Sequence, residues 1–145
     1  MKVDLFGLCF AATKGALGEL NILGLTEIIF LPQYPASINA SIVGKLRFQT
    51  GEDGVKELKI TIVNMDGKPL CPPVIQTANV QIPAGASSAI VGIIQGIQNL
   101  QISSPGQYQI GLIVNQREEA SVAIHALQPP QFQKPPMLSG EQGQS

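Results

Sequence analysis

The clearest alternation of apolar and polar residues in this chain lies between residues 105 and 127. Apolar side chains occupy every second position over residues 108–114, which is the pattern of a strand with one buried face. A polar interruption at residues 115–118 follows, and the alternation resumes over residues 122–126. Two strands joined by a short polar turn predict a β-hairpin, and we expect the rest of the fold to be organised around it.

Weaker alternations upstream predict further short strands. Gly24 interrupts one of these alternations, and an isolated glycine inside a strand indicates a bulge or a bend. The pair Asp66-Gly67 is typical of a tight turn. Prolines confine residues 68–83 to an edge strand or an irregular connection. The expected elements are strands over residues 3–12, 20–30, 37–49, 58–63 and 88–95, a single helical turn over 16–19, a turn over 96–99, and a lead-in to the hairpin over 100–103.

Seven or eight short, mainly antiparallel strands with frequent turns predict an all-β fold, namely an immunoglobulin-like two-sheet β-sandwich. Tyr108 follows the turn-forming run Ser104-Pro105-Gly106 at the start of a late strand. That is the position of a tyrosine corner, in which the hydroxyl ties the turn to the sheet. There is no tryptophan, so the Cys–Trp–Cys core of antibody domains is absent.

The domain organisation follows from a change in composition near residue 127. Residues 1–127 carry the strand patterns, and we expect them to form the β-sandwich domain. Residues 128–145 are rich in proline and glutamine and lack alternation, so we expect a flexible tail. A proline-rich ligand for a partner's aromatic groove is the alternative interpretation of this tail.

Charged residues make up only 13% of the chain, about half the ~25% usual in globular proteins. Such a surface repels other proteins weakly, so we expect a protein partner or a homo-oligomer. The net charge is −1 and the lysines and arginines are scattered, whereas binding to a phosphate backbone needs them clustered. The composition therefore disfavours nucleic acid as a partner.

The beginning of the chain does not fit a secretory signal peptide, because Asp4 lies inside a short apolar run. No run of 18 apolar residues is present, so we expect no membrane partner and a cytoplasmic location. Cys9 and Cys71 are too few for a disulfide framework. In the cytoplasm both would be reduced and would act as small apolar residues.

Five segments in a fixed order resemble a family of small uncharacterised bacterial proteins that carry a domain of unknown function. The segments are DLFGLCFAA, GELNILGLTEIIF, LPQYPASINASIVGKLRF, LKITIVNMDGKPL and SPGQYQIGLIVN, and they extend over about residues 3 to 127. The resemblance implies a small, mostly cytoplasmic β-sandwich without an assigned activity. It brings no catalytic or binding residues with it.

Residues that could support catalysis are few. His125 is the only histidine, so a Ser–His or Cys–His mechanism would have to place it beside Ser121, Cys9 or a carboxylate. No nucleophile elbow or cysteine signature accompanies it, and one histidine with two distant cysteines does not suffice for structural zinc. We therefore expect no enzyme, and we assign no catalytic, cofactor-binding or metal-binding residue and no cofactor.

Two acidic loops offer an alternative function. Residues 51–54 and 64–67 would form a calcium site or a small-ligand site if they met at one end of the sandwich, with oxygens from Glu52, Asp53 and Asp66. The more ordinary interpretation is that these residues form turns. Tyr34 is the only aromatic residue expected at the surface, which disfavours a carbohydrate platform.

The function that the sequence favours is therefore a non-enzymatic β-sandwich that acts through protein contacts, as an interaction or structural module. Strands that are apolar on both faces, over residues 5–10 and 90–94, support this hypothesis. The alternative is a small-ligand or calcium-binding domain that uses the loops at 51–54 and 64–67.

Overall fold

A computed structural model describes residues 1–130, and these residues form an all-β fold. No helix is found among them, so none is present that could cross a membrane. The strands are β1 (Lys2–Cys9), β2 (Ala11–Lys14), β3 (Leu20–Leu23), β4 (Ile28–Phe30), β5 (Ala36–Gln49), β6 (Gly54–Asn64), β7 (Val74–Val80), β8 (Ser88–Ile102), β9 (Gly106–Val114) and β10 (Arg117–Leu127). The tail predicted for residues 128–145 lies outside the described residues from 131 onward.

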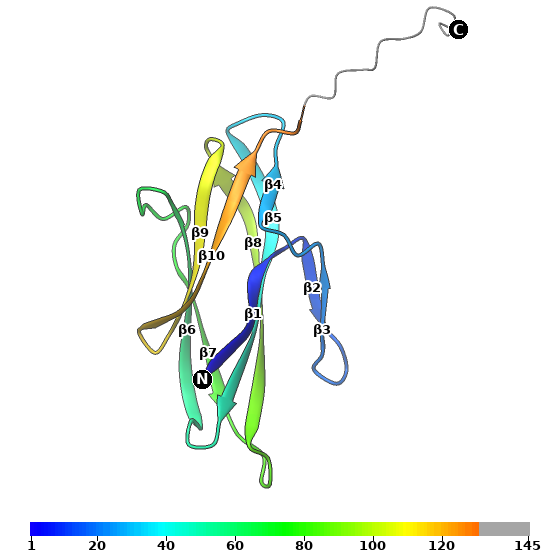
Figure 1. The fold of residues 1–145 in the computed structure, drawn as a ribbon, viewed down its shortest axis with the longest axis vertical. Helices are drawn as coiled ribbons and strands as arrows, with labels where there is room; N and C mark the ends of the chain where they lie inside the picture. Colours follow the sequence, from blue (N-terminus) through cyan, green and yellow to red (C-terminus); the bar gives the residue numbers. More distant parts are fainter. Residues whose placement is uncertain (131–145) are drawn as a thin grey trace, which may run out of the picture.

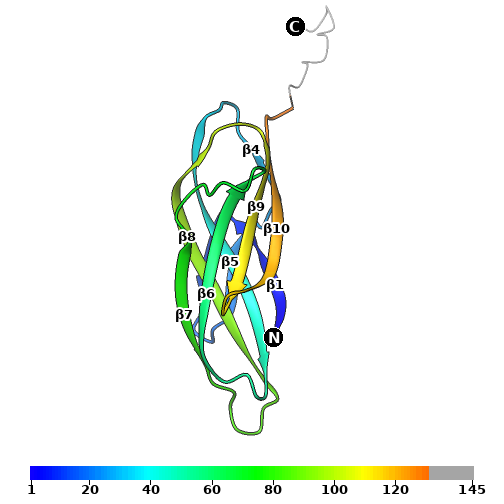
Figure 2. The same ribbon diagram turned by 90° about the vertical axis from the view of Figure 1, so that its left-hand side faces the viewer.

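The strands form three sheets. A three-stranded sheet has the order β1-β5-β8, a five-stranded sheet has the order β4-β10-β9-β6-β7, and β2 and β3 form a two-stranded ribbon. Figure 1 shows the ribbon beside the three-stranded sheet, on the side away from the five-stranded sheet. Figure 2 shows β7, β6, β9 and β10 across the face of the molecule. Every ladder is antiparallel except the short one between β4 and β10, which matches the prediction of mainly antiparallel strands.

The central hairpin is formed by β9 and β10, as predicted. Its turn residues Asn115 and Gln116 have φ values of 48° and 68°, which is the left-handed conformation that two-residue hairpin turns require. The Tyr108 hydroxyl donates a hydrogen bond of 2.7 Å to the carbonyl oxygen of Ser104, so the predicted tie between turn and sheet is present. This hairpin lies in the interior of the five-stranded sheet, because β6 pairs with β9 and β4 pairs with β10.

One hydrophobic core lies between the three-stranded and five-stranded sheets. Its members come from alternate positions of long strands, which explains why one parity of each strand is buried. The largest side chains with almost no exposure include Phe48 and Leu46 of β5, Leu58 and Ile60 of β6, and Leu112 of β9. No charged or polar residue among residues 1–130 is fully buried.

Three predicted elements are wrong, namely the turn over 96–99, the separate lead-in over 100–103 and the helical turn over 16–19. The strand expected over 88–95 is present, but it continues beyond residue 95 as one 15-residue strand, β8. Asn99 accommodates a bulge there with a φ of 55°, and its backbone N–H donates to the Asn39 side chain at 2.8 Å. The helical turn expected over 16–19 is a hairpin turn between β2 and β3.

The number of strands also exceeds the prediction, with ten in place of seven or eight. The additional strands arise because the segments expected over 3–12 and 20–30 each divide in two. Residues 68–83, expected at an edge, contain β7, which is the edge strand of the five-stranded sheet. The Asp66-Gly67 pair lies in a turn closed by the hydrogen bond from the Gly67 N–H to the Asn64 carbonyl at 3.0 Å.

Candidate interaction surface

The β2–β3 ribbon, called here the arm, leaves the body of the fold after Cys9 and returns at Gly24. Four residue pairs join its strands, from Ala11 with Leu23 to Lys14 with Leu20. The turn contains Gly18 with a φ of 82°, which glycine adopts without the steric penalty of a Cβ. The arm is therefore a regular hairpin, although it is too short to be stable without contacts to the body.

The arm contacts the outer face of the three-stranded sheet, opposite the main core. A Cβ atom added to Gly92 of β8 would lie 3.4 Å from Cδ2 of Leu20 and 3.2 Å from Cε of Lys14. Glycine at this position of β8 therefore leaves the space that the arm's side chains fill. Val43 and Cys9 on the same outer face are 0% and 1% exposed, although neither belongs to the main core. The arm thus helps to close a second, smaller apolar layer.

Large apolar side chains are exposed along the arm and the segment that follows it. Eleven exposed large hydrophobic residues occur among the described residues, and six of them fall between residues 10 and 30. We call these six the apolar rim: Phe10 (69% exposed), Leu17 (94%), Leu23 (69%), Leu25 (50%), Ile28 (43%) and Phe30 (52%). Each such side chain gains about 1.5–3 kcal/mol when it is fully buried, so their concentration in one segment favours a contact surface.

Phe10 is held at the base of the arm by its contact with Gly24. A Cβ atom on Gly24 would stand only 2.1 Å from Cδ2 of Phe10, and Gly24 has a φ of 74°. The Phe10 ring therefore lies directly on the glycine backbone. The predicted interruption at Gly24 is confirmed, and its physical reason is this close approach together with the left-handed conformation.

An open groove with a volume of about 480 Å³ lies between the edges of β1 and β10. Its lining includes Phe6 and Gly7 of β1, Val122 of β10, and the segment from Leu25 to Ile28. The Thr26 N–H donates to the Leu8 carbonyl at 2.9 Å, and its hydroxyl bonds with the backbone of Ile28. These bonds fix the segment that crosses from the arm to β4, so the groove has a defined wall.

The structure does not bring His125 together with the nucleophiles considered for it. His125 is exposed on β10, where Gln107 and Ile28 are its ladder partners. Ser121 lies four residues earlier on the same strand, which at 3.3 Å per residue is roughly 13 Å away. Cys9 is buried in the three-stranded sheet. A catalytic pair built on His125 would need these groups within hydrogen-bond distance.

The acidic loops of the calcium hypothesis lie at opposite ends of β6, and this hypothesis is wrong. β6 runs for 11 residues from Gly54 to Asn64, which separates the two loops by roughly 33 Å. Asp53 accepts a hydrogen bond from the Ile82 N–H at 3.1 Å, whereas Glu52 bonds to the beginning of the chain. The carboxylates of Glu52 and Asp53 therefore bond to different parts of the fold, and residues 1–130 contain no group of three or more metal-ligating side chains.

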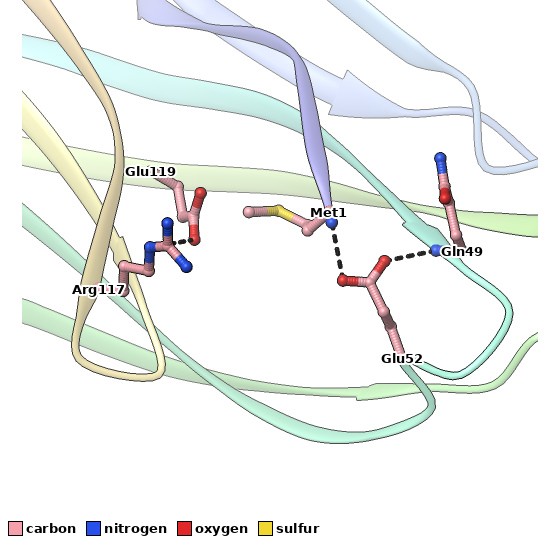
Figure 3. A network of polar contacts seen from close by, with 5 residues as sticks. All are labelled: Met1, Gln49, Glu52, Arg117 and Glu119. Atoms are coloured by element: carbon pink, nitrogen blue, oxygen red, sulfur yellow. Dashed lines mark hydrogen bonds and ion pairs between the residues drawn. The ribbon is translucent and has the colours of Figure 1, made fainter.

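Glu52 forms a polar network that sequence reasoning did not anticipate (Figure 3). One carboxylate oxygen accepts a bond from the Met1 ammonium at 2.7 Å, and the other accepts the Gln49 N–H at 2.8 Å. These bonds, that from the ammonium first, lower the pKa of the Glu52 carboxyl. The network joins β1 to the loop after β5.

The two thiols and Tyr34 occupy structural positions. Cys9 and Cys71 are free, the first buried and the second half-buried, and burial raises the pKa of both thiols. Both therefore fit the predicted role of small apolar residues. Tyr34 was expected to be exposed, but it is half-buried and its hydroxyl donates to the Leu127 carbonyl at 2.8 Å. The exposed aromatic side chains are instead Phe10 and Phe30.

Sequence reasoning missed the arm and the apolar rim. The signal was present as two short alternations on either side of Gly15–Gly18, with apolar residues on both parities. A strand that is apolar on both faces is also typical of burial between two layers. The sequence pattern alone does not show whether the apolar side chains of the arm are exposed or buried, because this depends on where the arm lies against the body of the fold.

Comparison with known protein families identifies a match over most of the chain. The model of a family of unknown function (DUF6941) matches residues 4–127, and the chain belongs to this family. The resemblance to a domain of unknown function is therefore confirmed, whereas the bacterial origin and the sandwich architecture remain predictions. No curated protein matches the chain.

Solved structures give only remote similarity. A β-glucuronidase from glycoside hydrolase family 2 matches with a TM-score of 0.36 and 17% identity, over 70% of this chain and 12% of the enzyme. The Pseudomonas fluorescens alkylpurine DNA glycosylase AlkC, bound to DNA containing an abasic site analog, matches with a TM-score of 0.37 and 13% identity, over 84% of this chain and 30% of that protein. The chain spans a small part of either protein, and TM-scores this low carry no argument about fold or activity.

Proposed function

We propose that this family member is a non-enzymatic protein-interaction module, in which the apolar rim of the arm and β4 contacts another protein. The observation that carries the proposal is the concentration of exposed apolar side chains in residues 10–30. Contiguous exposed apolar patches mark interaction sites on protein surfaces. Aromatic residues such as Phe10 are enriched at the cores of protein interfaces, where they are shielded from water.

The strand edges of the arm support the same proposal. Within the described residues, β2 and β3 pair only with each other, so each presents an outer edge of backbone N–H and carbonyl groups. An extended segment of a partner can pair with such an edge, and its side chains then meet the apolar ones of the arm. The arm therefore offers both backbone hydrogen bonds and apolar contacts.

The proposal is non-enzymatic because the groups that could support catalysis are dispersed. His125 is on the surface of the five-stranded sheet, whereas Cys9 is buried in the other sheet. The fold that we propose is an immunoglobulin-like sandwich, which the shared core and the Tyr108 tie support. The proposed compartment is the cytoplasm, where the free thiols would persist. Exclusion of nucleic acid and membranes as partners stays a prediction from the composition.

The test is a purification of the protein from its producing cells at low salt, followed by identification of co-purifying proteins by mass. It compares the natural chain with the double variant Leu17→Gln and Leu23→Gln. We expect a stoichiometric partner with the natural chain and at least a tenfold loss of this partner with the variant. The two residues are among the most exposed of the rim, so folding should not depend on them.

The matched control is Val55→Gln with Ile75→Gln, which removes two exposed apolar residues of the five-stranded sheet. This control should retain the partner at the level of the natural chain. Equal loss in both variants, or equal retention, would overturn the proposed role of the rim. A natural chain that is recovered alone and monomeric would overturn the interaction function itself.

A further inference from the structure

The two strands that border one side of the fold carry no charged residue. Residues 69–116 contain no aspartate, glutamate, lysine, arginine or histidine, although charged residues make up 13% of the whole chain. This stretch includes β7 and β8, which are outer strands of the five-stranded and the three-stranded sheet. Figure 2 shows both along the same side of the molecule, away from β1 and β10. Two neighbouring sheet edges are therefore without charge.

β8 is the least protected of the sheet edges. It is 15 residues long and pairs only with β5 among residues 1–130. Proteins usually protect such an edge from pairing with another chain by shortening it or by placing charges or proline in it. β4 is only three residues long, and β1 carries Lys2 and Asp4. The regular part of β8, from Ser88 to Ile97, has neither charge nor proline.

The backbone of β8 offers hydrogen-bonding groups along its open edge. The Thr50 N–H donates to the Ser87 carbonyl at 3.1 Å, which continues the ladder between β5 and β8. Hydrogen-bonded pairs alternate along an antiparallel ladder, so the odd-numbered residues from 89 to 97 bond to β5. The even-numbered residues direct their N–H and carbonyl groups to the open edge, namely Ile90, Gly92, Ile94 and Gly96. The Gly96 carbonyl accepts the Gln95 side-chain amide at 2.9 Å, which agrees with this outward direction.

A second copy of the chain is the partner that this edge fits. Two β8 strands related by a two-fold axis run antiparallel, so the outward groups of one meet the outward groups of the other. Like charges directly opposite each other destabilise a strand pair, and this pairing opposes none. An uncharged edge also offers no charge by which a foreign strand could be selected.

The lysines near Gly92 indicate where the two-fold axis lies. Cε of Lys14 stands 3.2 Å from the position of a Cβ on Gly92, and Lys45 is the ladder partner of Gly92. Neither lysine forms an ion pair within residues 1–130. An axis at Gly92 would bring the ammonium groups of both copies together. An axis at Ile94 separates the two Gly92 residues by about 13 Å along the strands, which exceeds the Debye length of about 8 Å at physiological salt.

We propose that this protein forms a two-fold dimer in which the β8 strands of two copies pair antiparallel about Ile94. Gly92 of each copy then lies opposite Gly96 of the other, and three strands from each copy form one continuous sheet. The dimer goes beyond the proposed function, because no residue of the apolar rim lies on this edge and the rim stays open in both copies.

A charge at residue 96 tests both the dimer and its register. Gly96 is exposed and nothing lies within 4 Å of its Cβ position, so a substitution should not disturb the single copy. In the dimer the new side chain would lie beside Lys14 and Lys45 of the second copy. In its own chain it is four residues from Gly92, or about 13 Å from these lysines. Gly96→Lys should therefore weaken dimerisation at least tenfold relative to Gly96→Ala, whereas Gly96→Glu should not weaken it.

Sedimentation equilibrium of the whole chain over a concentration series measures the dissociation constants. We expect the natural chain to dimerise, and the double variant Leu17→Gln and Leu23→Gln to dimerise equally well. A natural chain that stays monomeric at every concentration would overturn the proposal. A Gly96→Lys dimer that is as tight as the Gly96→Glu dimer, or tighter, would overturn the register. A dimer that only the rim variant dissociates would overturn the pairing through β8. Because the rim test uses Leu17 and Leu23, failure of either proposal can be recognised separately.

Discussion

The molecule contains two antiparallel hairpins that have opposite roles. In β9–β10, alternate residues such as Ile110 and Leu112 are 2% and 0% exposed, and neighbouring strands flank both sides of the hairpin. In β2–β3, Leu17 and Leu23 are 94% and 69% exposed, and no further strand of the described residues 1–130 pairs with the ribbon. The difference shows that hairpin geometry alone does not decide between core and contact surface. The decisive factor is what lies against each face.

The largest difference between the hairpins should appear on removal of a leucine side chain from each. Leu112→Ala deletes a fully buried side chain at the centre of the core and should lower the free energy of unfolding by about 2–5 kcal/mol. Leu23→Ala, the matched change in the arm, should alter it by only about 0.5 kcal/mol or less. Urea denaturation of both variants measures the two values. Similar losses would show that the arm contributes to the core as much as the central hairpin does.

The next effect concerns the attachment of the arm. Gly92→Leu places a side chain where Leu20 and Lys14 now lie and should displace the arm, with an overpacking cost of about 1–3 kcal/mol. Opening of the arm should also increase the rate at which the buried Cys9 thiol reacts with a labelling reagent. Gly96→Leu on the same strand is the control, because nothing lies within 4 Å of its Cβ position. Equal thiol reactivity in the two variants would contradict the contact described for Gly92.

A smaller effect is expected from the hydroxyl that ties the central hairpin to its preceding turn. Tyr108→Phe removes the bond to the Ser104 carbonyl and should cost about 1 kcal/mol, because the acceptor is left partly buried. Tyr34→Phe removes a more exposed bond to Leu127 and should cost less. Thermal unfolding of both variants ranks these bonds. A larger loss of stability in Tyr34→Phe would contradict this ranking. It would show that the bond from the loop before β5 stabilises the fold more than the bond of the central hairpin.

The smallest effect should come from Glu52 and should depend on pH. The folded-state pKa of this carboxyl is below the ordinary value of 4.5, so its bonds stabilise the fold above that value. This contribution is lost as the pH falls through the lowered pKa. The unfolding temperatures of the natural chain and of Glu52→Gln should therefore differ near neutral pH and converge in acid. Acetylation of the Met1 amine removes the same ion pair and should likewise lower the unfolding temperature near neutral pH but not in acid. A difference in unfolding temperature between the natural chain and Glu52→Gln that does not vary with pH would contradict this account.

Much of the fold could be predicted because its strands are long and bury one face. The alternation over residues 37–49 corresponds to β5 (Ala36–Gln49), and the hairpin around Asn115 and Gln116 was predicted with its turn. The error at residues 96–99 has a physical cause. Gly96 and Asn99 are typical turn residues, but a bulge opposite Asn39 accommodates Asn99 and the strand continues.

The candidate surface could not be predicted in the same way. Leu23 and Leu112 have the same side chain and both stand in an alternating segment, yet one is exposed and the other is buried. The exposure of Leu23 therefore depends on an arrangement in space that a local pattern does not encode. The calcium hypothesis failed because β6 places Asp53 and Asp66 at its two ends, a separation that the strand expected over residues 58–63 already implied.

Amide hydrogen exchange across the whole chain tests the central claim most directly, namely that one hairpin holds the fold and the other is free to bind. We predict that β9 amides, such as those of Ile110 and Leu112, exchange only through global unfolding. The amides of β2 and β3 should exchange through a local opening of the arm, at rates at least a hundredfold higher. Equal protection of the two hairpins would contradict the account, because the arm would then be part of the cooperative core.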